Sequence, residues 1–290
     1  MLKIAPSELI LNPDGSVYHL NLKPEHIADT IIFVGDQNRV PKVASYFEKI
    51  VYDTQKREFR TITGFFKGKK ISVISTGIGP DNIDIAMNEL DALVNIDLQT
   101  RTVKEKHTQL DIVRIGTSGS LQNYIPVDSF VLAKYGLGFD GMLHSYDCEH
   151  ILEKDIEDAF IEHTDWSIRK SRPYAVKGSG KLQQKLSGDN VYEGVTATAV
   201  GFYGPQGRVL RLKLQDPDLN RKIDNFEYKG IRVTNLEMET SAIYGLAKLL
   251  GHEALSMNAI IANRANGTFS ENPYMPVEEL IKYTLNKLIQ

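Results

Sequence analysis

Several apolar runs rich in β-branched residues recur along the chain and end in glycine or small polar residues. Their apolar character is continuous rather than alternating, which predicts strands buried on both faces, as in a sheet covered by helices. The runs are residues 30–36, 71–79, 111–119, 129–136, 191–199, 231–238 and 254–263. Residues 59–76 differ from the rest and indicate a hairpin that turns at Lys67–Lys69.

Helical patterns lie between these runs. Residues 39–50 have a proline in the first turn, where its missing N–H costs nothing, and residues 82–97 place apolar side chains on one face. Residues 240–250 stop at Gly251, a suitable C-terminal cap, and residues 277–290 predict a last amphipathic helix. This alternation of strand and helix predicts a single α/β domain over residues 1–290.

Composition narrows the class of protein. The 290 residues are 42% hydrophobic, which is enough for a sizeable core, and the net charge of -3 favours neither nucleic acid nor an anionic membrane as a partner. Cys148 is the only cysteine, so a disulfide framework and a thiolate zinc site are excluded. No apolar stretch is long enough for a signal peptide or a membrane span. We therefore expect a cytoplasmic protein.

Two predicted strand ends suit an anion, and ligands of open α/β sheets gather at the carboxyl ends of strands. Gly35 and Arg39 follow the first strand at a strand-to-helix turn, where amides and a guanidinium can hold phosphate. An ordinary turn with a surface arginine is the alternative. Arg114 stands inside an apolar run and needs a carboxylate or a bound anion, with Thr117 adding a hydroxyl. A purely structural salt bridge is the alternative there.

Two further segments carry polar groups next to apolar runs. Residues 201–208 combine Phe202, Gln206 and Arg208 in a glycine-rich loop, which suits the edge and face of a flat heterocycle, although a polar surface loop is the simpler interpretation. Glu237 and Glu239 precede a helix and either cap it or hold a ligand.

Metal and triad chemistry find little support. Residues 144–150 gather histidines and acids around Cys148, but their spacing matches no familiar metal set and favours a solvated loop. No G-x-S-x-G elbow occurs in the chain.

Taken in order, these segments resemble the nucleoside phosphorylase family, specifically its uridine phosphorylase branch. The matching pieces extend over most of the chain: VGDQNRVPKVA, REF, STGIG, VRIGTSGSLQ, FYGPQGR, NLEMETSAIYGLAKLLGH and AIIANR. The resemblance implies a three-layer α/β/α fold with a central mixed, partly barrel-like sheet.

The resemblance also assigns a phosphate site. Gly35, Arg39, Arg114 and Thr117 match the family's phosphate residues, and Arg57 matches an arginine that a neighbouring subunit contributes to the same phosphate. The resemblance therefore implies a homo-oligomer in which two chains share each active site.

Ribose and base residues follow in the same way. His19 matches a histidine that crosses the interface towards the ribose 5′-hydroxyl, and Met238 and Glu239 match ribose contacts with Glu237 as their companion acid. The residues that match the uracil side are Gln206 and Arg208, with Phe202 packing nearby.

The implied activity is reversible phosphorolysis of uridine to uracil and ribose 1-phosphate, in pyrimidine salvage. Arg39, Arg114, Arg208 and Glu239 are the residues expected to carry the catalysis. A purine nucleoside phosphorylase, a hydrolytic nucleosidase of the same fold and a non-catalytic nucleoside-binding protein are the alternatives. Asn263 and Arg264 stand where the purine enzymes usually carry an aspartate, which argues for a pyrimidine.

No metal or organic cofactor is expected, since phosphate is a substrate. Some family members hold a monovalent cation at the dimer interface through residues that match Glu58, Ile78 and Asn82. Asn82 replaces a serine of the family pattern, and we leave that cation open.

Overall fold

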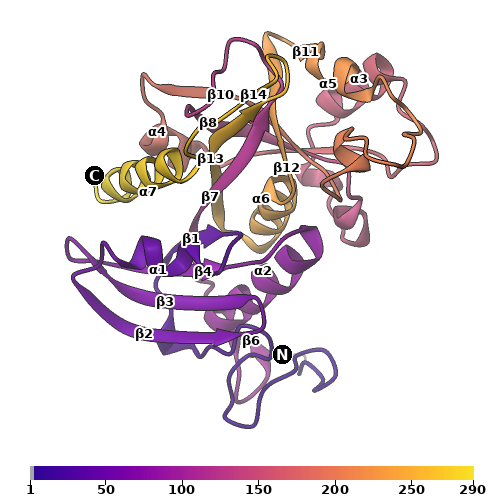
Figure 1. Ribbon diagram of the computed structural model, residues 1–290. Helices are drawn as coiled ribbons and strands as arrows, with labels where there is room; N and C mark the ends of the chain where they lie inside the picture. Colours follow the sequence, from indigo (N-terminus) through magenta and orange to yellow (C-terminus); the bar gives the residue numbers. More distant parts are fainter. Residues whose placement is uncertain (1–2) are drawn as a thin grey trace.

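The computed structural model describes residues 3–290 and contains one large mixed sheet with helices on both sides (Figure 1). All seven apolar runs form strands, as predicted. They are β1 (Thr30–Val34), β4 (Lys69–Ser75), β7 (Asp111–Ser120), β8 (Phe130–Gly138), β10 (Val191–Thr198), β12 (Ile231–Glu237) and β13 (Glu253–Asn263). The remaining strands are β2 (Lys49–Lys56), β3 (Phe59–Phe66), β5 (Ile96–Asp97), β6 (Thr102–Val103), β9 (Tyr174–Lys177), β11 (Glu227–Tyr228) and β14 (Thr268–Phe269).

The predicted hairpin is β3–β4, and its turn shows why the sequence signal is strong. Phe66 pairs with Lys69, which leaves Lys67 and Gly68 as a two-residue loop. Both residues have positive φ, 47° and 77°, and this conformation matches the right-handed twist of the two strands.

Pairing of β12 with β7 closes part of the sheet into a barrel. The main path runs β11-β12-β10-β8-β13-β7-β1-β4-β3-β2, and the additional β12–β7 contact joins β7, β13, β8, β10 and β12 in a ring. The predicted fold, α/β with a mixed and partly barrel-like sheet, is confirmed. The carboxyl ends of β7, β12 and β13 meet because Asn235 and Leu236 of β12 pair with Ser120 and Gly119 of β7.

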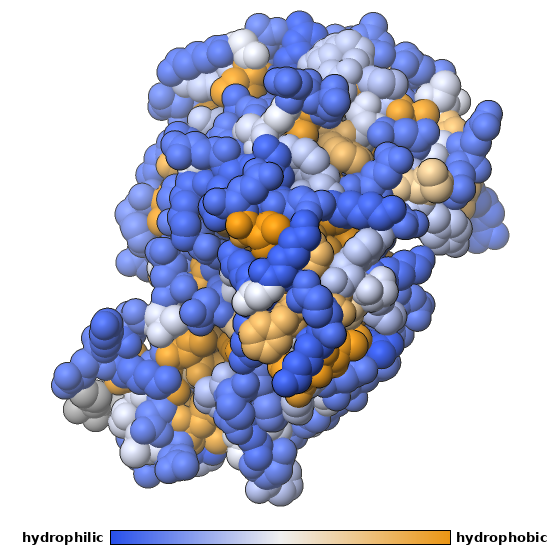
Figure 2. Space-filling model, turned by 90° about the vertical axis from the view of Figure 1, so that its left-hand side faces the viewer, coloured by the Kyte–Doolittle hydropathy of each residue, from blue (hydrophilic) through white to orange (hydrophobic). Residues whose placement is uncertain are grey.

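Within residues 3–290, seven α-helices surround the sheet. Helix α6 packs against α2 on one side, and α1, α4 and α7 lie against the sheet on the other (Figure 1). Figure 2 shows the second of these faces, on which apolar residues form small patches separated by hydrophilic ones. The helices are α1 (Arg39–Ala44), α2 (Pro80–Asn95), α3 (Lys154–Thr164), α4 (Gly180–Leu186), α5 (Leu219–Asp224), α6 (Thr240–Leu250) and α7 (Tyr274–Leu288).

One predicted helix is much shorter than expected. Residues 39–50 were predicted to be helical, but α1 ends at Ala44, and Lys49 pairs with Phe65 as the start of β2. Gly64 lies directly beneath the ring of Phe47, where a Cβ atom would collide with it. Pairing with β3 therefore overrides the local helical pattern. Helix α6 and its cap are confirmed, with Gly251 at φ 80° after the last turn.

Candidate active site

A cavity of about 550 Å³ opens where β1, β7, β12 and β13 end. Ten of the twelve predicted site residues line it: Gly35, Arg39, Arg114, Thr117, Phe202, Gln206, Arg208, Glu237, Met238 and Glu239. Such a volume is typical of a small-molecule site. Strand ends that lie far apart in the sequence are thus brought to one place by the parallel pairing of β7 with β1 and β13.

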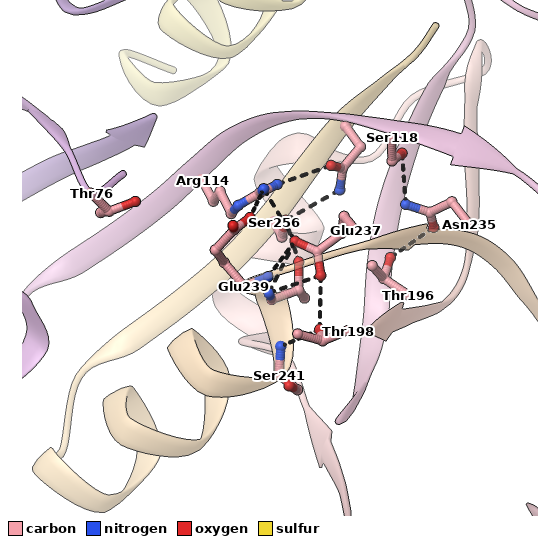
Figure 3. Close-up of polar contacts among 12 residues, drawn as sticks. Thr76, Arg114, Ser118, Thr196, Thr198, Asn235, Glu237, Glu239, Ser241 and Ser256 are labelled. Carbon is pink, nitrogen blue, oxygen red and sulfur yellow. Dashed lines mark hydrogen bonds and ion pairs between the residues drawn. The ribbon is translucent and has the colours of Figure 1, made fainter. Parts of the chain in front are cut away.

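Arg114 lies at the centre of the polar network at this cavity (Figure 3). It is 6% exposed, its Nη2 atom lies 3.2 Å from Glu237 Oε2 and also pairs with Glu239, and its Nη1 atom donates to Asn258 Oδ1 at 2.9 Å. Burial alone would lower the pKa of Arg114, but Glu237 and Glu239 outweigh it and raise the pKa. The carboxylate partner expected from the sequence is therefore present twice.

Glu237 holds the start of helix α6. Its carboxylate accepts the backbone amides of Glu239 and Thr240 at 3.0 Å, and Thr198 Oγ1 donates to it at 2.7 Å. Satisfying the free amides of a first turn is the role of a helix cap. Of the two alternatives for this acid pair, Glu237 meets the first, because it satisfies amides at the start of the helix.

Glu239 faces the cavity from the N-cap position of α6. One carboxylate oxygen accepts the amide of Gly79 at 2.9 Å, and the other pairs with Arg114. Burial raises the pKa of Glu239; Arg114 opposes this shift and the like charge of Glu237 adds to it. Two carboxylates thus share a single buried guanidinium.

This raised pKa makes the stability of the protein depend on pH. Above pH 4.5, the ordinary value, the folded state keeps a proton on Glu239 that the unfolded state has lost, so the free energy of unfolding falls as the pH rises towards the folded pKa. We expect Glu239→Gln to lack this contribution. Urea unfolding between pH 4.5 and 8 measures it, with exposed Glu105→Gln as the control. Parallel pH profiles for wild type and Glu239→Gln would contradict the assignment.

The predicted phosphate residues lie together beside this cluster. Arg39 begins α1 and donates from Nη1 to the carbonyl of Ile115 at 3.1 Å. Burial lowers the pKa of Arg39, and the positive charge of Arg114 lowers it further. The two positive charges repel each other, and an anion bound between them would relieve the repulsion. Gly35 and Thr117 line the same end of the cavity.

The predicted base residues form a connected group at another wall. Gln206 is buried, and its side-chain oxygen accepts from Arg208 Nη1 and Arg264 Nη2, both at 2.7 Å. The Arg208 guanidinium lies 3.7 Å from the centre of the Phe202 ring. Arg264 belongs to this group although spacing along the chain did not point to it. The feature of the sequence that could have identified Arg264 is its position directly after the apolar run that forms β13.

His19 and Arg57 do not line the cavity. The Nδ1 atom of His19 lies 2.7 Å from Glu89 Oε1, and Arg57 is exposed, with its guanidinium 5.9 Å from the Tyr18 ring. The ring of His19 lies 4.8 Å from the same tyrosine. The two residues therefore share a patch around Tyr18, outside the site of their own chain.

The three positions matched to a cation site do not form a ready set of ligands. The amide nitrogen of Asn82 donates to the Ile78 carbonyl at 3.4 Å. This hydrogen bond occupies the carbonyl oxygen that would have to bind the cation. Within residues 3–290 there is no group of three or more His, Cys, Asp or Glu side chains placed to hold a metal ion. Among the helices of that range, none combines the length and the apolar character that a membrane span requires.

Known proteins resemble this chain along nearly its whole length. It is 28% identical over 278 residues to the uridine phosphorylase of Thermococcus kodakarensis, covering 93% of this chain and 85% of that protein. It is 26% identical over 275 residues to a DeoD-type purine nucleoside phosphorylase of Bacillus subtilis, covering 94% and 99%.

Solved structures agree with the sequence comparison. A Trypanosoma brucei nucleoside phosphorylase, described as showing uridine phosphorylase activity, superposes with a TM-score of 0.87 at 28% identity, covering 97% of this chain and 99% of that one. The sequence model of the Phosphorylase superfamily matches residues 29–285. The chain belongs to the phosphorylase superfamily.

Proposed function

We propose that the protein is a uridine phosphorylase, which converts uridine and phosphate reversibly into uracil and ribose 1-phosphate and serves pyrimidine salvage. The observation that carries the proposal is the three-part wall of one cavity. Two arginines lie at one end, Glu239 lies beside them, and Gln206 with Arg208 forms the third part. Relatives named uridine phosphorylase support the same activity.

The proposed chemistry needs positioning and charge stabilisation. Arg39 and Arg114 hold phosphate below C1′, and Glu239 accepts hydrogen bonds from the ribose hydroxyls beside Met238. As the bond between ribose and base stretches, the sugar becomes positive and the base negative. Arg208 then stabilises the charge on a uracil carbonyl, as donors of an oxyanion hole do.

A pyrimidine fits the base wall better than a purine does. The side-chain oxygen of Gln206 already accepts from Arg208 and Arg264, so the Gln206 amide nitrogen and the Arg208 guanidinium are the donors offered to the two carbonyls of uracil. Asn263 lies at the position of the proton donor of purine enzymes, but its amide nitrogen is bound to the carbonyls of Gln122 and Ile125 at 2.9 and 2.7 Å. A side chain held in this way does not serve a leaving purine.

Phosphorolysis explains the anion end better than hydrolysis does. Water as the nucleophile gives no reason for two guanidiniums to line one cavity, where burial and then repulsion by Arg114 lower the pKa of Arg39. A phosphate dianion offsets that repulsion and is oriented by several N–H donors.

The decisive experiment incubates the pure protein with uridine, inosine and adenosine, each with and without phosphate. We expect uracil release from uridine only when phosphate is present. Release of hypoxanthine from inosine without uridine cleavage would refute the base assignment. Uridine cleavage at equal rates without phosphate would refute the mechanism.

We also propose that two chains share each site, with Arg57 and His19 reaching the neighbour's phosphate and ribose. Arg57→Ala and Arg39→Ala should each be nearly inactive alone. Co-expression of the two should restore about a quarter of wild-type activity, because random pairing makes half of the dimers mixed and each mixed dimer has one intact site. Activity no higher than that of either variant alone would contradict shared sites.

No metal ion or organic cofactor has a part in this scheme, and we propose that the enzyme acts in the cytoplasm on nucleosides rather than on nucleic acid or at a membrane. Dialysis against a chelator should leave uridine phosphorolysis unchanged. A loss that potassium or sodium restores would instead indicate the interface cation known in the family.

A further inference from the structure

A second cavity, of about 790 Å³, adjoins the first at Arg208. Arg208 is the one residue within 3–290 that lines both cavities. Phe139 and Leu219, which belong to a buried apolar cluster, form part of its lining, together with Trp166 and residues 210–214. Its volume lies within the range of small-molecule sites.

The apolar part of this lining is unusually open to solvent. In the segment between β10 and α5 (Figure 1), Leu210, Leu212 and Leu214 alternate with Arg211 and Lys213. Leu210 and Leu212 are 77% and 78% exposed. Covering leucine side chains with another apolar surface is favourable, because it removes their apolar area from water.

Two aromatic rings, tilted by 38° to each other, line part of the cavity, and the Lys170 ammonium lies 4.6 Å from the centre of the Trp166 ring. Trp166 lies 4.9 Å from Phe139, measured between ring centres, and its indole N–H donates to the carbonyl of Ser171 at 2.9 Å. This hydrogen bond fixes the orientation of the ring. A planar aromatic ligand gains contact area on such a surface at little cost in conformational entropy.

The charge balance of the lining favours an anion. Its two acids are already bound, because Asp216 pairs with Lys222 at 2.9 Å and Asp140 accepts from Tyr174 at 2.8 Å. Lys170, Arg211 and Lys213 also line the cavity, and in the part of the chain that the structure describes they form no ion pair. Three cations beside an apolar surface complement one negative group on an apolar ligand.

Contacts link this cavity to the catalytic one. Arg208 stacks on Phe202 in the first cavity while it lines the second. A chain of hydrogen bonds also connects the two cavities. Ser241 donates from Oγ to Asp140, which lines the second cavity, at 3.3 Å, and from its amide to Thr198 at 2.9 Å. Thr198 in turn donates to Glu237, whose carboxylate accepts the amides at the start of α6 (Figure 3).

We propose that the second cavity binds a small planar aromatic molecule that carries a negatively charged group, and that its occupation changes the affinity of the catalytic cavity for the base. The change in affinity for the base rests on the proposed function. The binding of the aromatic anion does not, because it depends only on the second cavity.

Trp166 is the only tryptophan of the chain, so its fluorescence reports on this cavity. We expect anilinonaphthalene sulfonate to quench it saturably, with uracil and phosphate present or absent. Arg211→Glu/Lys213→Glu should weaken binding of this probe about tenfold. Exposed Lys106→Glu/Lys177→Glu, with the same change in net charge, should bind it as the wild type does.

Three results would overturn the proposal. One is no saturable quenching, as expected if residues 209–214 or a second copy of the chain fill the cavity. Another is equal affinity in the two double variants. The third is competitive displacement of the probe by uracil, which would place it in the catalytic cavity.

The activity assay separates the two halves. In wild type the probe should change the KM for uridine at least about twofold, because Arg208 lines both cavities. An unchanged KM for uridine would overturn the coupling. A protein that does not cleave uridine refutes the proposed function, whereas the fluorescence titration still decides whether the cavity binds the probe.

Discussion

Arg114→Met is expected to lower kcat/KM for uridine by at least about 10²–10³-fold and to destabilise the fold by about 3–5 kcal/mol. Arg114 neutralises Glu237 and Glu239, both of which are buried. Its removal leaves two carboxylates without a counter-charge and takes one guanidinium from the proposed phosphate site. Urea unfolding gives the stability, and initial rates of uracil release below the unfolding transition give the activity.

Arg114→Met/Glu237→Gln separates the two effects. The second substitution removes one of the stranded charges, so it should return part of the lost free energy of unfolding. Activity should not return, because the phosphate site still lacks its guanidinium. Stability of the single variant equal to wild type would contradict the ion-pair interpretation, and recovered activity in the double variant would contradict a role for Arg114 in phosphate binding.

Arg208→Ala is expected to lower kcat/KM for uridine about 10²–10³-fold, because it removes a donor aimed at the charge that develops on uracil. The fold should tolerate this change, since Arg208 is only half-buried and bonds within its own loop. Initial rates over a range of uridine concentrations measure the effect, and the urea midpoint tests the fold.

Arg211→Ala is the matched control, since it removes a guanidinium from the same segment, three residues further on, without touching the catalytic cavity. It should keep near-wild-type kinetics. A large loss in Arg211→Ala, or near-normal kinetics in Arg208→Ala, would contradict the assignment of the uracil side. Arg264→Ala should fall between the two, because Arg264 acts on the base only by holding Gln206.

Features that depend on neighbours along the chain could be predicted from the sequence. The continuous apolar runs identified seven strands, and the β3–β4 turn followed from Lys67–Gly68, whose backbone conformation the twist of the strands demands. The helical pattern wrongly predicted a helix for residues 45–50, because pairing with β3 decides between helix and strand there.

The site divides in the same way. Its chemistry could be predicted, because a buried arginine such as Arg114 needs an anionic partner wherever the chain places it. Which of two acids serves the helix could not be predicted. Glu237 and Glu239 are two residues apart, and their roles depend on where Thr198, Gly79 and Arg114 lie in space.

By itself, then, the sequence determined the order of strands and helices, the capping at Gly251 and the polar residues available at the strand ends, all of which follow from local backbone preferences and side-chain chemistry. Only the tertiary structure decided the ring closed by β12 and β7, the hold of Arg264 on Gln206 and the second cavity beside Arg208. Each of these depends on contacts between segments far apart along the chain. Their geometry is set by packing of the whole sheet, which no short stretch of residues encodes.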